Sequence, residues 1–273
     1  MKFVTVKGVA VPTIGLGTWA LSGRQCIESV RTALELGYRH IDTADMYGNE
    51  REIGTAIREA RFDRTQLFIT TKVPPGKLHA AAAKRCAEES LKRLGTDYVD
   101  LLLVHWPNSQ IPLAETLGAF AELHASGKAR HIGVSNFPVA LLREAVETHH
   151  ADLFCNQVEY HPYLSQRAVL AAVRRYGMML TAYAPIAKGR VPRDANLAAI
   201  GRKYGKTAAQ LTLRWLIDQD GVVAIPKASS RAHLAANLDI FDFTLTPEDR
   251  AAIDAMGGDD RLRNFGAARW DPA

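Results

Sequence analysis

The chain has 273 residues, of which 47% are hydrophobic and 23% charged, and its formal net charge at pH 7 is +5. Its Lys and Arg residues alternate with acids along the chain, which argues against the clustered basic face of a nucleic-acid-binding protein. The sequence contains no run of 18 apolar residues of the kind that spans a membrane, and Met1–Ala10 lacks the apolar core of a signal peptide. We therefore expect a cytoplasmic protein with no membrane or nucleic-acid partner.

Two short apolar runs around Lys7-Gly8 predict a β-hairpin at the start of the chain, Phe3–Val6 and Val9–Val11. Eight further β-rich runs follow: Ile14–Leu16, His40–Ile41, Leu67–Thr71, Val99–Val104, His131–Val134, Phe154–Val158, Met178–Ala182 and Val222–Ile225. Segments with helical periodicity lie between them, among them Gln25–Leu36, Glu50–Glu59, Ala80–Leu94, Leu113–Ala125, Val139–Glu147, Asn196–Tyr204 and Ala208–Gln219. The last segment, Gly257–Ala273, has little periodicity and reads as a tail.

Five glycines each follow a helical segment and precede a strand, as expected where a helix ends at positive φ: Gly37, Gly95, Gly127, Gly177 and Gly221. This repeated unit predicts an α/β fold, a (β/α)8 TIM barrel with an N-terminal β-hairpin and a C-terminal tail over the barrel. We expect one domain over residues 1–273. An open doubly wound sheet is the alternative, because a number of strands does not prove closure.

The three cysteines, Cys26, Cys86 and Cys155, are odd in number and far apart. Neither a disulfide framework nor a structural zinc site has that pattern. His105 has no partner at a metal-ligand spacing, and His149 and His150 are adjacent, which is poor geometry for shared ligation. We therefore predict no metal site.

Polar side chains lie at the ends of the predicted strands, and they are Asp42, Lys72, His105, Ser135 with Asn136, Gln157, Tyr183 and Lys227. In a barrel these positions converge on one mouth, where barrel enzymes carry out their chemistry. Taken singly, each has a structural explanation: Asp42 as a helix cap, Lys72 as a solvated charge and His105 as a packed core residue. Several ionisable types at successive strand ends are not what a structural core requires.

Three of these groups, Asp42, Lys72 and His105, could transfer a proton together with Tyr47. A tyrosine with a pKa near 10 is a poor proton donor at neutral pH. A nearby ammonium stabilises the phenolate, so we expect Lys72 to lower the pKa of Tyr47. We expect Asp42 to hold Lys72 charged and in place, and His105 to orient a substrate oxygen or relay the proton.

A set of ordered motifs resembles the aldo-keto reductase family: Gly15-Leu-Gly-Thr-Trp19, Gly37-Tyr-Arg-His-Ile-Asp-Thr-Ala44, Tyr47-Gly-Asn-Glu50, Thr70-Thr-Lys72, Asp97-Tyr-Val-Asp-Leu101, His105-Trp-Pro107, Gly133-Val-Ser-Asn-Phe137, Asn156-Gln157 and Ile225-Pro-Lys227. They occur in family order from about Phe3 to Asn237, which is nearly the whole chain. The short chain and its ending, Asp260-Arg-Leu-Arg263 followed by Trp270-Asp271, are similar to bacterial 2,5-diketo-D-gluconic acid reductases and methylglyoxal reductases.

The resemblance implies a catalytic tetrad of Asp42, Tyr47, Lys72 and His105, with Tyr47 as general acid. The cofactor site that it implies comprises Gly17, Thr18, Asp42, Ser135, Asn136, Gln157, Tyr183, Ala184, Pro185, Ile225, Lys227, Ala228, Ser229, His233 and Asn237. In that site the nicotinamide would stack on Tyr183 and the adenine 2′-phosphate would meet Lys227. The substrate pocket it implies is Trp19, Met46, Tyr47, His105, Trp106 and Trp270, with core packing as the alternative for the tryptophans and Met46.

Four positions depart from the family pattern. Ala184 and Ala228 stand where the family often has serine, and Ala236 stands where it has glutamate. His233 aligns with the arginine expected to grip the 2′-phosphate, and a neutral imidazole cannot replace the guanidinium fork. We favour NADP(H) because Lys227 remains, with NAD(H) as the alternative.

The sequence thus predicts NADPH-dependent reduction of aldehydes or ketones, with small dicarbonyls, keto acids or keto esters as substrates and a monomeric protein. One alternative is an NADPH-binding regulatory subunit that senses redox state with little turnover. Another is a barrel isomerase or lyase that uses Lys72 as a Schiff base. Arg261, Arg263 and Arg269 could favour anionic substrates, although we expect them to be solvated charges on a tail.

Overall fold

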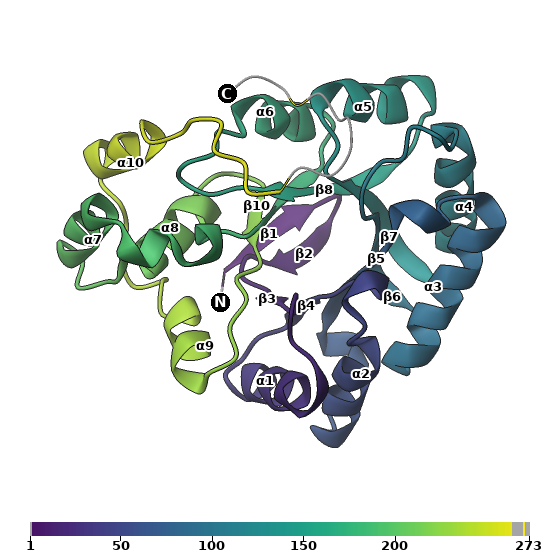
Figure 1. The fold of residues 1–273 in the computed structure, drawn as a ribbon, viewed down its shortest axis with the longest axis horizontal. Coiled ribbons are helices and arrows are strands. Elements are labelled where there is room, and N and C mark those ends of the chain that lie inside the picture. The colour runs from purple at the N-terminus through teal and green to yellow at the C-terminus, as the bar shows by residue number, and fades with distance from the viewer. Residues whose placement is uncertain (1, 264–269, 271–273) are drawn as a thin grey trace.

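The computed structural model describes residues 2–263 and 270, and its centre is a ring of parallel strands surrounded by helices (Figure 1). The strands are β3 Leu16–Gly17, β4 His40–Asp42, β5 Phe68–Val73, β6 Val99–Val104, β7 Ala129–Ser135, β8 Leu153–Glu159, β9 Met179–Tyr183 and β10 Val222–Ala224. They pair in chain order from β3 to β10, and every pair is parallel.

The sheet closes between its first and last strands. Ile14 and Gly17 form parallel bridges with Ala224 and Lys227, and the Gly15 N–H donates to the Ala224 carbonyl at 2.9 Å. A Cβ atom on Gly17 would lie 2.5 Å from the Ile225 carbonyl oxygen, so only glycine allows this approach. The predicted barrel is therefore confirmed, and the open sheet is wrong.

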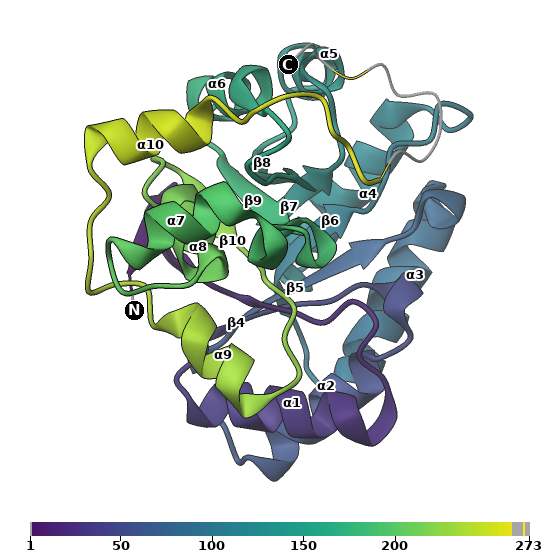
Figure 2. The same cartoon turned by 60° about the vertical axis from the view of Figure 1, so that its left-hand side comes forward.

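The helices cover the outside of the barrel (Figures 1 and 2). They are α1 Gly23–Glu35, α2 Glu50–Glu59, α3 Ala80–Leu94, α4 Leu113–Ala125, α5 Val139–Arg143, α6 Arg167–Arg175, α7 Ala195–Arg202, α8 Ala208–Ile217, α9 Arg231–Leu238 and α10 Pro247–Asp254. The predicted segment Val139–Glu147 is α-helical only to Arg143 and then widens into a π-turn, Glu144–Thr148. The five predicted helix stops are confirmed, because all five glycines have positive φ.

The N-terminal hairpin closes one end of the barrel. It consists of β1 (Phe3–Val6) and β2 (Val9–Pro12), and it is visible through the middle of the barrel in Figure 1. Val6 and Val11 pack in one buried cluster with residues from the starts of the strands, among them Phe68, Phe154, Met179 and Val223. This packing fills the amino end of the barrel and leaves the carboxyl ends of the strands as the mouth.

The segment after α10 runs past α6 along the mouth of the barrel (Figure 2). Leu164 and Asp259 form an antiparallel bridge, and the Ser165 N–H donates to the Gly258 carbonyl at 2.8 Å. The predicted tail is therefore fixed in place up to Arg263, while Arg269 lies outside the described residues. Among residues 2–263 and 270, no helix has the length and apolar character needed to cross a membrane.

Candidate active site

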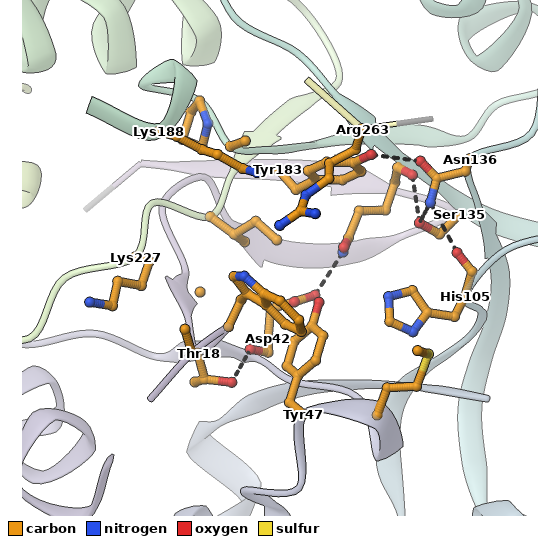
Figure 3. Close-up of a pocket in the computed structure, with 18 of the residues that line it drawn as sticks. Thr18, Asp42, Tyr47, His105, Ser135, Asn136, Tyr183, Lys188, Lys227 and Arg263 are labelled. Carbon is orange, nitrogen blue, oxygen red and sulfur yellow. Dashed lines mark hydrogen bonds between the residues drawn. The ribbon is translucent and has the colours of Figure 1, made fainter. Parts of the chain in front are cut away.

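A pocket of about 470 Å³ opens at the carboxyl ends of the strands (Figure 3). Of the residues predicted from the sequence, those that line it are Gly17, Thr18, Trp19, Asp42, Met46, Tyr47, His105, Trp106, Ser135, Asn136, Gln157, Tyr183, Ala184, Pro185, Ile225 and Lys227. They come from every side of the barrel. Lys72 lies directly behind this wall, fully buried, and contacts the pocket through Asp42 and Tyr47.

Lys72, near the carboxyl end of β5, is held by three oxygen atoms. Its Nζ lies 2.6 Å from Asp42 Oδ1 and 2.8 Å from the Thr43 carbonyl oxygen. The third oxygen is the Tyr47 hydroxyl, at 3.5 Å. Because burial is offset by Asp42, the pKa of Lys72 is raised above its ordinary value and the amine is charged. A protonated, enclosed amine is not a nucleophile, which argues against the Schiff-base alternative.

The hydroxyl of Tyr47 has a different pKa from the one the sequence suggested. Lys72 lowers the pKa of Tyr47 as expected, but burial of the phenol raises it by more, so the net shift is upward. The expected net lowering is therefore wrong, because withdrawal of the phenolate from water outweighs one ammonium at 3.5 Å. As a result Tyr47 carries its proton at neutral pH, which is the state a proton donor must have.

Tyr47 sits in a short 3₁₀ turn, Asp45–Tyr47, that is fastened from outside the pocket. Arg93 Nη2 lies 2.6 Å from Asp45 Oδ1 and 2.7 Å from Glu50 Oε2, so one guanidinium ties the turn to the start of α2. Lys77 binds the other oxygen of Asp45 at 2.8 Å. These ion pairs fix the turn that aims the phenol into the barrel mouth.

His105 faces Tyr47 across the pocket, with ring centroids 5.6 Å apart in an edge-on arrangement. Burial and the charge of Lys72 lower the pKa of His105 to about 3, so its imidazole is neutral at pH 7. Its Nδ1 atom is buried and has no hydrogen-bond partner among the described residues. A neutral imidazole beside a protonated phenol can hold one oxygen between two hydrogen-bonding groups.

Amide and hydroxyl groups from three strand ends form a connected network beside the tetrad. Gln157 Nε2 donates to Asp42 Oδ2 at 2.7 Å, and Ser135 Oγ donates to the Gln157 carbonyl at 2.8 Å. Asn136 Nδ2 donates to the His105 carbonyl, and Tyr183 Oη donates to Asn136 Oδ1 at 2.9 Å. Asn136 has φ 62°, a conformation that asparagine tolerates better than most residues. The network fixes the position of the Tyr183 ring at the pocket wall.

Several predicted residues do not line this pocket. Ala228 and Ser229 follow Lys227 in the next loop, while His233 and Asn237 lie on α9. Trp270 also stays away from the pocket lining and stacks on the Arg261 guanidinium, whose Cζ lies 3.7 Å from the ring centroid. The predicted contact of Trp270 with the substrate therefore stays a prediction.

The pocket also contains residues that the sequence did not predict, namely Ala20, Pro75, Ile186, Lys188, Gly189 and Arg263. Lys188 belongs to the loop after β9, where only the residues up to Pro185 were identified. Arg263 was expected to be a solvated charge on the tail, with a role toward anionic substrates as the alternative, and it lines the pocket. Trp19 and Met46 are 50% and 55% exposed at the mouth, which removes core packing as an explanation for these two.

A barrel whose mouth carries an acid, a lysine, a tyrosine and a histidine in contact defines the class of carbonyl oxidoreductases, and comparison with known proteins agrees. The sequence profile of the Aldo/keto reductase family matches residues 13–257. The chain belongs to the aldo/keto reductase family and is an oxidoreductase, and this family uses NAD(P)H.

The relatives are similar over almost their whole length. The chain is 40% identical to methylglyoxal reductase DkgB of Escherichia coli O157:H7, over 93% of this chain and 96% of that protein. It is also 40% identical to a glyoxal reductase of Bacillus subtilis (strain 168), with 94% of each chain covered. A crystal structure of a protein provisionally assigned as a 2,5-diketo-D-gluconic acid reductase B has a TM-score of 0.96 and 45% identity, covering 99% of this chain and 98% of that one.

Proposed function

We propose that this protein reduces aldehydes and ketones to alcohols with NADPH, and that Tyr47 donates the proton. The observation that carries the proposal is the contact of the Tyr47 hydroxyl with the buried ammonium of Lys72, at 3.5 Å, on the wall of the pocket. A buried lysine has no structural need to face a phenol there. A phenol that gives up its proton, however, needs a nearby positive charge to stabilise the phenolate.

The residues around the pocket fit a nicotinamide dinucleotide. Ser135, Asn136 and Gln157 bring hydroxyl and amide groups to one end, suited to the carboxamide, and Tyr183 offers an aromatic face beside them. Lys227, at the other side of the pocket in Figure 3, supplies positive charge for phosphate. These residues would hold the cofactor, which when bound supplies a hydride to the carbonyl carbon.

The residues of the chain account for the proton and for the orientation of the substrate. The carbonyl oxygen would accept hydrogen bonds from the Tyr47 hydroxyl and from the neutral imidazole of His105. As the oxygen gains negative charge, Tyr47 transfers its proton to it. The resulting phenolate lies beside Lys72, whose own charge is held by Asp42. General acid catalysis of this kind contributes a factor of about 10² to 10⁴.

The substrates we propose are small dicarbonyls, keto acids and keto esters. The relatives named above are methylglyoxal and glyoxal reductases, whose substrates are small dicarbonyl compounds by name. Exposed Trp19 and Met46 at the mouth leave room for a range of small carbonyls. For the cofactor we favour NADPH because of Lys227, although the exposed His233 lacks the bidentate grip of arginine.

The proposal is tested by titrating the protein with NADPH and with NADH by fluorescence, followed by steady-state assays with methylglyoxal, phenylglyoxal and a keto ester. We expect tighter binding of NADPH and cofactor consumption that matches alcohol formation. Tight NADPH binding with no turnover of any of these carbonyls would favour the redox-sensing alternative instead. Trapping of a carbonyl on Lys72 with borohydride would favour the Schiff-base alternative.

A further inference from the structure

Arg263 brings a guanidinium into the pocket from the tail. It lines the pocket, and Figure 3 shows its side chain projecting from the tail toward the side of the pocket that holds Tyr47. Its Cζ lies 5.9 Å from the centroid of the Trp19 ring, and that ring lies 5.0 Å from the ring of Tyr47. Trp19 is therefore a common neighbour of the guanidinium and of the proposed proton donor.

The guanidinium of Arg263 has no carboxylate within ion-pair distance among residues 2–263 and 270. Lys188, another cation of the pocket lining, likewise makes no ion pair in the described part of the chain. Its pKa is lowered by burial and by the charge of Arg263, so the two cations are close enough to repel each other. Asp42 is the single carboxylate among the described residues of the lining, and it is already paired with Lys72. The charge of buried Glu159 acts on Lys188 from behind, but neither Arg263 nor Lys188 has an ion-pair partner among the described residues, so both cations line the pocket unpaired.

The main chain at Arg263 is held by a buried carboxylate. Glu159, the last residue of β8, is fully buried and accepts the Leu262 N–H at 2.7 Å and the Arg263 N–H at 2.8 Å, one on each oxygen. His161 Nε2 lies 2.9 Å from the first of these oxygens. A buried carboxylate is costly unless it is hydrogen-bonded in this way. Glu159 therefore fixes the tail at the residue whose side chain enters the pocket.

We propose that Arg263 binds the carboxylate of an oxo acid substrate, and that Glu159 is a positioning residue that fixes Arg263 for this contact. The inference rests on the proposed carbonyl reduction and specifies the charge of its preferred substrate. Guanidinium and carboxylate form paired, charge-assisted hydrogen bonds, which a neutral ester cannot replace. The oxo acid is reduced by the same hydride and proton transfer, so its carboxylate is unchanged by the reaction.

The test compares substrates that differ only in the charge of one group: phenylglyoxylate with its methyl ester, and 4-carboxybenzaldehyde with its methyl ester. We expect the wild-type protein to have a higher kcat/KM for the acid than for the ester in at least one pair. Arg263→Met should lower kcat/KM for that acid roughly 10- to 100-fold, mainly through KM, and change the ester less than threefold. Arg263→Lys should retain part of the preference, because it keeps the charge and loses the fork.

Arg85→Met is the matched control, because it removes the same charge from an exposed position on α3, outside the pocket. Arg85→Met should leave kcat/KM unchanged for both the acid and the ester. Equal kcat/KM for acid and ester in the wild-type protein, or an unchanged ratio in Arg263→Met, would overturn the inference. NADPH titration is the second readout: if Arg263→Met weakens NADPH binding and slows acid and ester alike, Arg263 binds the cofactor phosphate and the inference is also wrong.

The role of Glu159 is tested by a double-mutant cycle. Glu159→Gln replaces one acceptor oxygen with an amide donor, which leaves an N–H of the tail without its partner, so it should reduce the acid-to-ester ratio as well. In the Arg263→Met background the same change should have no further effect on that ratio. Additive effects on the ratio would contradict positioning. Failure of the carbonyl chemistry itself is distinguishable, because the esters would then not be reduced either.

Discussion

The carboxylate of Asp42 lies 2.6 Å from the ammonium of Lys72, and the two side chains are 2% and 0% exposed. The other oxygen of Asp42 accepts a hydrogen bond from Gln157 at 2.7 Å. One buried carboxylate thus joins the lysine beside the proposed proton donor to the amide group proposed to face the nicotinamide. A change at Asp42 therefore reaches both the proton-transfer side and the cofactor side of the site.

Asp42→Asn should destabilise the protein by roughly 3 to 5 kcal/mol, because it leaves the Lys72 ammonium buried without a counter-charge. The double variant Asp42→Asn/Lys72→Met removes both charges and should recover part of that loss. The free energy of unfolding in urea measures both. If the double variant were less stable than Asp42→Asn, loss of the counter-charge would not explain the lower free energy of unfolding of the single variant.

The rate of carbonyl reduction should be nearly independent of pH between about 5.5 and 9. The pKa of His105 is lowered to about 3 and that of Tyr47 is raised, so neither group changes its protonation state in this interval. The decline at high pH, where Tyr47 loses its proton, should lie above pH 10. A profile of kcat/KM against pH checks this, and an inflection near 6.5 would mean that His105 titrates normally.

The barrel interior should make the protein sensitive to acid. Burial lowers the pKa of His40 from 6.5 to about 4, so between these values the unfolded chain binds a proton that the folded chain does not. The free energy of unfolding should therefore fall as the pH drops through this window, by about 3 kcal/mol at pH 4 from this group. His40→Gln should show a shallower dependence on pH in urea denaturation. Identical slopes for the two proteins would show that His40 is not the cause.

His233→Arg should tighten NADPH binding roughly tenfold and leave NADH binding nearly unchanged. His233 is exposed on α9, beyond Lys227, at the position where the family has the arginine proposed for the 2′-phosphate. Guanidinium binds phosphate through two parallel hydrogen bonds that a neutral imidazole cannot form. Fluorescence titration of both cofactors measures the change. An equal gain for NADH would place the new arginine at a phosphate that both cofactors share.

The sequence was sufficient for the parts of this fold that depend on local pattern. Strand and helix periods, glycine helix stops and the polar residue at the end of each strand predicted the barrel and the polar residues of the pocket. The other predicted lining residues came from the resemblance to the aldo-keto reductase family. Closure depends on Gly17 meeting Ile225, which are far apart in the chain, so no local pattern reports it. Three helices were given no bounds from the sequence, namely α6, α9 and α10, although Gly177 marked the end of α6. All three are short, and helices of this length depend on tertiary packing for their stability.

Two features of the site depend on contacts between residues distant in the sequence, and they were predicted incorrectly. The pKa of Tyr47 is the net result of burial and of Lys72, and the sequence shows the lysine but not the extent of burial. Arg263 reads as a tail charge, because nothing in the sequence links it to Glu159, which holds its main chain. In both cases the deciding contact joins groups distant in the sequence.

The central claim, that Tyr47 is the proton donor, is tested most directly by Tyr47→Phe. The protein should remain folded and bind NADPH with an affinity within about threefold of wild type, while kcat for methylglyoxal falls by at least 10². Thermal unfolding and cofactor fluorescence confirm that only the hydroxyl has been lost. Turnover within a factor of a few of the wild-type rate, in a folded variant that binds NADPH normally, would contradict the account.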